Sequence, residues 1–326
     1  MPNATRDQHP ILVVHPDRKT QRTVHRIVGG TFRPVILVDD LANAAVRVRE
    51  TPPFLIIIDH QMIRTEEGRA LLADRKVPCL VLMQDSEPDD VGPLLQNGAL
   101  SYLLANPMPL LAEELSITVQ KLTRRDIFGL EKYLTWGIEI RELTLTDSDQ
   151  RRSLVDEMGE DVQRAGLGPR ALAATLIADE LLSNAVFNAP VDDSGSHTHS
   201  GDDRSGSRPL ADRDVVRLRY ACDARYLAIE VEDRYGSLDR ATILRCLTKA
   251  TTRARDKVSM GTRGAGIGLA TVYGSCNHLV FNLEPGRRTQ AIALVDVRFR
   301  PAELGNAVCS FGIFSTQAGS TEERRS

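Results

Sequence analysis

The chain has 326 residues, more than one ordinary domain core requires, and this length predicts two domains. Apolar residues make up 42% of the sequence, enough for a sizeable buried core, so a disordered chain is excluded. The net charge is −3, from 41 basic and 44 acidic residues, and we expect no direct nucleic-acid partner because such partners need a basic surface.

The cysteine pattern and the N-terminus together predict a cytoplasmic location. The five cysteines are scattered, show no CxxC spacing, and are typical of reduced thiols inside a cell. The N-terminal stretch MPNATRDQHP has no apolar signal core, and no apolar run approaches membrane-spanning length. We therefore expect a cytoplasmic protein without membrane contact.

The first part of the chain alternates short apolar runs with amphipathic segments. Strands are expected at 11–17, 34–40, 54–62, 78–85 and 100–107. Helices are expected at 18–30, 41–51, 66–76, 89–99 and, with a break near Gly129, at 108–137. Five such units predict an α/β domain over residues 1–125, with a flavodoxin-like, doubly wound parallel sheet.

The second part has a different order of elements. Helices at 148–166 and 168–190 precede strands at 215–223, 226–234, 279–286 and 290–300, with a further helix at 238–253. This order predicts a two-layer α/β sandwich over 151–314, with a connecting segment at 126–150. A mobile loop is expected at 191–214, because Gly, Ser and Asp dominate it, and a disordered tail at 315–326.

Three motifs in the second part carry its chemistry. ELLSNA places Glu180 and Asn184 four residues apart on one helix face, VEDRYGSLD places Asp233 at a strand end before Gly236, and GTRGAGIGL precedes a helix. In this order, over roughly residues 140–300, the sequence resembles the GHKL ATPase superfamily, whose ATP-binding domain has the Bergerat fold. It is most similar to the anti-sigma-factor serine kinases of that superfamily.

The resemblance implies ATP and Mg²⁺ as cofactors. It places Asn184 at the Mg²⁺ ion, where a hard carbonyl oxygen is suitable, and Asp233 at the adenine amino group, which guanine lacks. Glu180 would be the catalytic residue, accepting the proton of an attacking hydroxyl or water. The remaining implied nucleotide-binding residues are Gly236, Gly264, Gly266, Gly268, Leu269 and Thr289. The sequence departs from the family pattern at Tyr235 and Ser237, which stand where the family has glycine.

The histidine positions separate the kinase classes within this superfamily. None of the seven histidines lies between residues 61 and 196, so the phosphoacceptor helix of a histidine autokinase is missing. We therefore expect transfer to serine or threonine of a partner protein, a signalling protein or a sigma or anti-sigma regulator. Three alternatives stay open: a kinase of a histidine in another protein, a scaffold whose binding surface is shaped by nucleotide, and an ATPase switch without a protein acceptor.

The first part resembles the receiver domain of response regulators over about residues 10–125. Asp59 occupies the place of the phosphoacceptor. The acidic pair is replaced by His15 and Pro16, and the places of the hydroxyl and the lysine hold other residues. Without these groups Mg²⁺ has too few hard ligands, so we expect a pseudo-receiver that is not phosphorylated by the usual route. Its expected role, in a protein of two-component type, is docking or homodimerisation.

Overall fold

The structure is a computed structural model. It describes residues 9–73, 77–84, 91–96, 100–106, 112–199, 209–255, 267–298 and 308–316. Contacts divide the chain into two compact units. The first unit comprises Met1–Asp126 with Ser310–Gly312, and the second comprises Ile127–Cys309 with Ile313–Ser326.

The first unit contains a parallel sheet with strand order β2-β1-β3-β4-β5. Its strands are β1 (Ile11–Val14), β2 (Val35–Val38), β3 (Leu55–Asp59), β4 (Cys79–Gln84) and β5 (Tyr102–Asn106). This order is the flavodoxin-like one, as predicted. The first residues of β11 (Ser310–Ser315) add an antiparallel pairing to β5, with Phe311 opposite Leu103.

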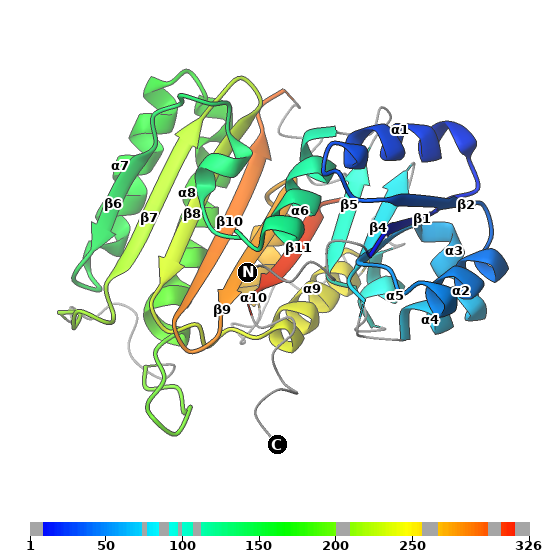
Figure 1. Ribbon diagram of the computed structural model, residues 1–326. Helices are drawn as coiled ribbons and strands as arrows, with labels where there is room; N and C mark the ends of the chain where they lie inside the picture. Colours follow the sequence, from blue (N-terminus) through cyan, green and yellow to red (C-terminus); the bar gives the residue numbers. More distant parts are fainter. Residues whose placement is uncertain are drawn as a thin grey trace, which may run out of the picture. The chain divides into compact units, whose positions relative to one another are not determined.

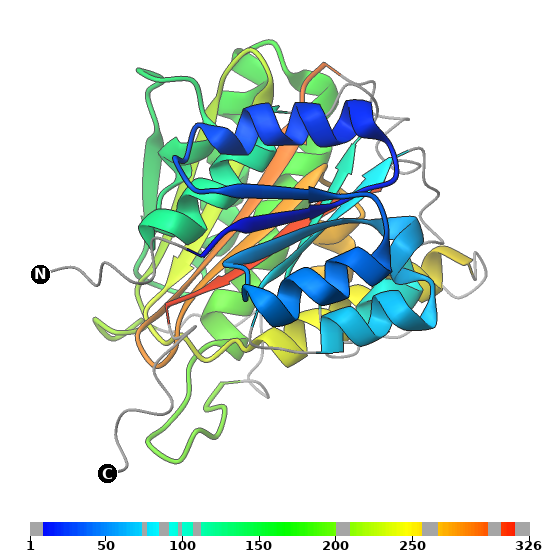
Figure 2. The same ribbon diagram turned by 45° about the vertical axis from the view of Figure 1, so that its right-hand side comes forward.

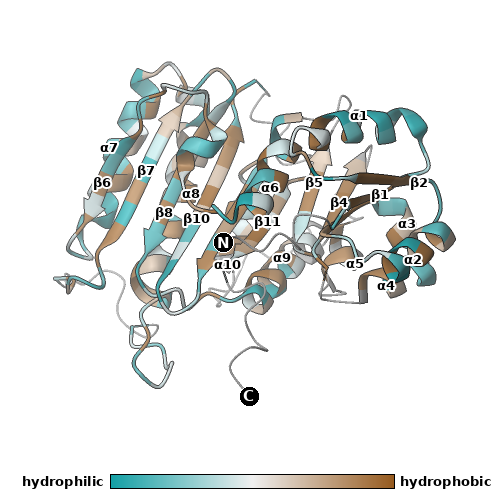
Figure 3. Cartoon of the chain, viewed as in Figure 1, coloured by the Kyte–Doolittle hydropathy of each residue, from teal (hydrophilic) through white to brown (hydrophobic). Residues whose placement is uncertain are grey.

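Helices cover both faces of this parallel sheet. They are α1 (Arg18–Gly29), α2 (Leu41–Glu50), α3 (His60–Ile63), α4 (Glu66–Ala73), α5 (Val91–Gln96) and α6 (Ala112–Arg124). Helices α1 and α6 pack together on one face, and α2, α3 and α4 lie on the other (Figures 1 and 2). Because both faces are covered, β1 and β3 are buried along their whole length, and β1 is brown throughout in Figure 3.

Helix α6 ends at Arg124, so the predicted long helix stops five residues before its predicted break near Gly129. Arg125 adopts a positive φ of 55° and Gly129 a φ of 115°, and neither value continues a right-handed helix. The chain after Asp126 belongs to the second unit instead. There it forms the short 3₁₀ helix η3 (Leu130–Tyr133) and strand β6 (Arg141–Leu145).

The second unit contains an antiparallel sheet with strand order β9-β10-β8-β7-β6. Its other strands are β7 (Val216–Cys222), β8 (Tyr226–Asp233), β9 (His278–Glu284) and β10 (Arg288–Asp296). These four strands agree with the predicted ones. Strands β6 and β11 were not predicted, because β6 is a largely polar edge strand and β11 is short and contains Gly312.

Helices α7 (Gln150–Arg164) and α8 (Gly168–Ser183) cover one face of this sheet (Figure 1). Helix α8 continues into a π-helical turn, η4 (Asn184–Asn188), and α9 (Arg240–Arg255) and α10 (Ile267–Tyr273) follow later in the chain. Helix α10 packs on α8 and α9. Of the predicted mobile loop, residues 200–208 lie outside the described residues, as do residues 317–326 of the predicted tail.

Candidate functional site

In the second unit, the packing of α10 on α8 brings together three of the predicted site residues. Gly268 opens α10 so close to α8 that a Cβ atom added to it would lie 2.4 Å from Glu180 Oε2. The same Cβ position lies 3.6 Å from Asn184 Nδ2. Glu180, Asn184 and Gly268 are therefore neighbours, and only glycine at 268 leaves the Glu180 carboxylate where it is. Leu269 is buried beside them, whereas Gly264 and Gly266 lie outside the described residues.

The backbone changes its hydrogen-bonding pattern at Asn184. Its carbonyl oxygen accepts a hydrogen bond from the N–H of Ala189, five residues later, at 2.9 Å. Such π-turns occur often at functional sites, because they displace side chains from the regular helix face. Oδ1 of Asn184 accepts a hydrogen bond from Asn188 Nδ2 at 2.8 Å, and the buried Nδ2 of Asn184 has no hydrogen-bond partner within the protein. The side chain thus offers an unpaired donor and a carbonyl oxygen with one remaining lone pair.

Asp233 is a buried carboxylate at the end of β8. Its Oδ1 accepts hydrogen bonds from the N–H groups of Tyr235, at 2.8 Å, and Gly236, at 3.1 Å. Thr289 lies directly opposite it on β10. Burial raises the pKa of Asp233 to about 6, although the contacts to Tyr235, Gly236 and Thr289 act in the opposite direction. Asp233 is thus a buried acceptor whose position is fixed by the backbone of the segment that follows it.

The segment after Asp233 contacts the end of η4 and the turn between β9 and β10. Gly236 has a φ of 61°, and a Cβ atom there would lie 2.2 Å from the carbonyl oxygen of Glu284, so glycine is required. Ser237 Oγ donates a hydrogen bond to the carbonyl oxygen of Ala189 at 2.7 Å, at the end of η4. Tyr235, the other departure from the family pattern, contacts Asp214 through its hydroxyl. Both departures therefore make contacts that glycine could not make.

These residues suit an adenine nucleotide with Mg²⁺. A buried acceptor at Asp233 matches an amino-group donor, and the unpaired N–H of Asn184 matches a phosphate oxygen. The carbonyl oxygen of Asn184 is a hard ligand of the kind that Mg²⁺ prefers. The Glu180 carboxylate, one turn before Asn184, lies beside the Asn184 side chain at Gly268. The donor set thus fits the group that the sequence implies.

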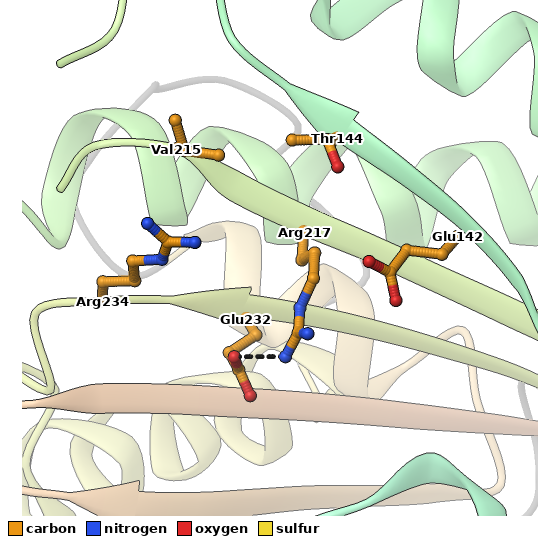
Figure 4. Close-up of a pocket in the computed structure, with 6 residues that line it drawn as sticks. All are labelled: Glu142, Thr144, Val215, Arg217, Glu232 and Arg234. Carbon is orange, nitrogen blue, oxygen red and sulfur yellow. Dashed lines mark hydrogen bonds and ion pairs between the residues drawn. The ribbon is translucent and has the colours of Figure 1, made fainter. Parts of the chain in front are cut away.

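A polar pocket of about 190 Å³ lies elsewhere on the same sheet (Figure 4). Its lining residues are Glu142, Thr144, Val215, Arg217, Glu232 and Arg234. Glu232 and Asp233 are successive residues of β8, so their side chains point to opposite faces of the sheet. The pocket therefore does not belong to the Asp233 site. An ion pair of 2.5 Å between Arg217 and Glu232 already neutralises charge within it.

The first unit has a buried cluster around Asp59, at the end of β3. The Oδ2 atom of Asp59 lies 3.5 Å from Nε2 of His15 and 3.7 Å from Nδ1 of His60. The N–H of Asp17 donates to Nδ1 of His15 at 3.0 Å, so the neutral His15 ring carries its proton on Nε2, towards Asp59. Oδ1 of Asp59 accepts a hydrogen bond from the N–H of Gln61 at 2.9 Å.

The surroundings of this cluster lower the pKa values of both His15 and Asp59. Burial lowers the pKa of His15, and the nearby Asp59 only partly opposes this effect. For Asp59, burial acts to raise the pKa, but the hydrogen bond to His60, the electrostatic interaction with the two imidazoles and the hydrogen bond from the N–H of Gln61 outweigh it, so the pKa is lowered. Asp59 is thus an ionised carboxylate between two imidazoles. The sequence placed His15 at the acidic-pair position but did not indicate that it contacts Asp59.

The described part of the chain contains neither a cluster of metal-binding side chains nor a membrane-spanning helix. No group of three or more His, Cys, Asp or Glu side chains there is arranged to hold a metal ion. None of the helices described is both long enough and apolar enough to cross a membrane.

Comparison with known proteins finds similarity only in solved structures. Neither protein-family models nor curated proteins match the chain. A response regulator structure from Chloroflexus aurantiacus is 18% identical, with a TM-score of 0.32, and the match covers 36% of this chain and 99% of that one. A two-component response regulator from Clostridium difficile is 15% identical, with a TM-score of 0.33, covering 37% and 100%. A receiver domain from Clostridium thermocellum is 16% identical, with a TM-score of 0.31, covering 36% and 96%. At such low identities and TM-scores, the fold assignment of the first unit depends on its own strand order.

Proposed function

We propose that this chain is a signalling protein in which the second unit binds ATP with Mg²⁺ and transfers the γ-phosphoryl group to a serine or threonine of a partner protein. The observation that carries this proposal is the convergence of Glu180, Asn184 and Gly268 on one side of the sheet where Asp233 ends β8. These residues come from three separate motifs, so their meeting in one unit supports a shared ligand.

Each residue would have a distinct role in the reaction. Asp233 would accept a hydrogen bond from the adenine amino group, and Asn184 would hold Mg²⁺ through its carbonyl oxygen. The bound Mg²⁺ supplies charge neutralisation for the transferring phosphoryl group. Glu180 would accept the proton of the attacking hydroxyl, whose oxygen forms the new P–O bond as the bond to ADP breaks.

The first unit would provide a docking surface rather than phosphoryl chemistry. Asp59 is enclosed by His15 and His60, whose imidazoles supply no hard oxygen ligands for Mg²⁺. The proposal is therefore that partner proteins, or a second copy of the chain, recognise the surface of this unit. The likeness to response regulators agrees with a role in signalling.

The test is phosphotransfer from γ-labelled ATP with Mg²⁺, with and without a lysate of the source organism. Label should appear on a lysate protein with the wild type, and Glu180→Gln, which keeps the side-chain size and removes the base, should abolish it. Glu160→Gln, the same substitution at an exposed position of α7, is the matched control and should behave as the wild type. Bound but untransferred ATP, with Glu180→Gln indistinguishable from wild type, would instead favour a nucleotide-gated scaffold. Released labelled phosphate without a labelled protein would favour the ATPase switch.

A further inference from the structure

Two buried cysteines of the second unit lie in contact. Cys276 stands between α10 and β9, and Cys309 immediately precedes β11. Their sulfur atoms are 3.7 Å apart, and each residue is 3% exposed. They are 33 residues apart in sequence, so the fold, and not chain proximity, brings them together.

Hydrogen bonds anchor the chain at Cys309 and at Asn277, the residue after Cys276. The hydroxyl of Tyr273, at the end of α10, donates to the carbonyl oxygen of Cys309 at 2.9 Å. On the other side, the N–H of Asn277 donates to the carbonyl oxygen of Leu294 at 2.9 Å. The two sulfur atoms are thus held in van der Waals contact by anchored chain segments, and a disulfide of about 2.05 Å requires them to approach further.

We propose that Cys276 and Cys309 form a reversible disulfide when the protein meets a peroxide. One thiolate attacks a peroxide oxygen, which gives a sulfenic acid and releases hydroxide. The second sulfur then attacks the sulfenic sulfur, so the S–S bond forms and water leaves. The pair loses two electrons to the peroxide, and a thiol reductant restores both thiols.

The disulfide would connect the chain just after α10 to the start of β11. Helix α10 carries Gly268 and Leu269, so the bond would attach the helix of the proposed nucleotide site to a strand far along the chain. Closing a loop of this length restricts the unfolded chain, so the oxidised protein should unfold at a higher temperature than the reduced one. Disulfide formation does not depend on ATP binding, so a chain that binds no ATP should still form the bond.

The test treats the full chain with hydrogen peroxide, then blocks remaining thiols with N-ethylmaleimide in guanidinium chloride and digests it with trypsin. Cleavage places Cys276 in peptide 264–287 and Cys309 in peptide 299–324. Mass spectrometry should find these two peptides joined, with a loss of about 2 Da for the two hydrogens, and the joined species should disappear with dithiothreitol. The melting temperature should rise on oxidation and fall again on reduction.

Variants separate this pair from other thiol chemistry. Cys276→Ser and Cys309→Ser should each abolish the joined peptides and the rise in melting temperature. Cys222→Ser, which alters a half-buried thiol that contacts the carbonyl oxygen of Asp223, is the matched control and should retain both. If the peptides that contain Cys276 and Cys309 carry N-ethylmaleimide and are not joined at peroxide concentrations that oxidise Cys222, the proposal is overturned. Joining of Cys276 or Cys309 to any other cysteine would overturn it as well.

Discussion

Replacing Asp233 by asparagine should stabilise the nucleotide-free protein at neutral pH while weakening its binding of ATP. Asparagine keeps an Oδ1 that can accept hydrogen bonds from the N–H groups of Tyr235 and Gly236. It removes a carboxylate whose ionisation is opposed by burial, which raises its pKa from 3.8 to about 6. The variant thus separates the cost of burying the charge from the hydrogen bonds that position the side chain.

The sign follows from the direction of the pKa shift. Below pH 3.8 the carboxyl is protonated in both the folded and unfolded states, and its contribution to stability is fully present. As the pH rises, the unfolded chain ionises first, so this contribution is lost until the folded-state pKa of about 6 is passed. A shift of two units corresponds to roughly 3 kcal/mol of lost stability, of which about 1.4 kcal/mol falls between pH 5 and pH 8.

The assay is urea unfolding of the wild type and Asp233→Asn without nucleotide, at pH 5 and pH 8. The difference in free energy of unfolding should move in favour of the variant by about 1–1.5 kcal/mol between these values. Glu230, whose pKa burial raises to about 7, contributes equally to both proteins and cancels. Asp239→Asn, at an exposed position, is the control for the substitution itself. A variant that loses stability relative to the wild type as the pH rises would refute the reasoning.

Three further outcomes are expected from single changes. Gly236→Ala should cost roughly 2–4 kcal/mol in urea unfolding, because its Cβ would meet the carbonyl oxygen of Glu284 at a positive φ; a cost below about 1 kcal/mol would contradict this. Gly268→Ala should change the free energy of unfolding by less than about 1 kcal/mol, because the Glu180 side chain can rotate away from the new Cβ atom. The same rotation should lower phosphotransfer roughly tenfold or more, and unchanged transfer would argue against Glu180 as the base. Acetyl phosphate with Mg²⁺ should leave Asp59 unmodified by intact mass, and a stable mass gain that Asp59→Asn abolishes would restore receiver chemistry to this unit.

Much of the fold could be predicted because hydrophobic pattern and burial agree. Strands such as β1 and β3 are continuous apolar runs, and the structure buries them completely. The hydrophobic pattern did not predict elements whose side chains are mostly exposed or whose ends depend on backbone conformation. Strand β6 is an edge strand with mostly exposed side chains, and the end of α6 depends on the positive φ of Arg125, which no periodicity indicates.

The sequence indicates the residue types of the candidate site but not their contacts. The spacing of Glu180 and Asn184 placed both on one helix face, but the π-turn at Asn184 and the approach of Gly268 require the folded chain. The imidazole pair around Asp59 likewise depends on His15 and His60 being brought together from two strand ends. The sequence shows that the acidic pair is missing, but it does not show that two imidazoles lie beside Asp59.

The most direct test of the account is a titration of the full chain with ATP and Mg²⁺ by isothermal calorimetry, with GTP as the comparison ligand. We predict one saturable site for ATP, weakened by Asp233→Asn by about 1–3 kcal/mol. We also predict far weaker binding of GTP, because guanine carries an oxygen where adenine carries the 6-amino group that would donate to Asp233. Absence of ATP binding at millimolar concentration, or equal binding of GTP, would contradict the account.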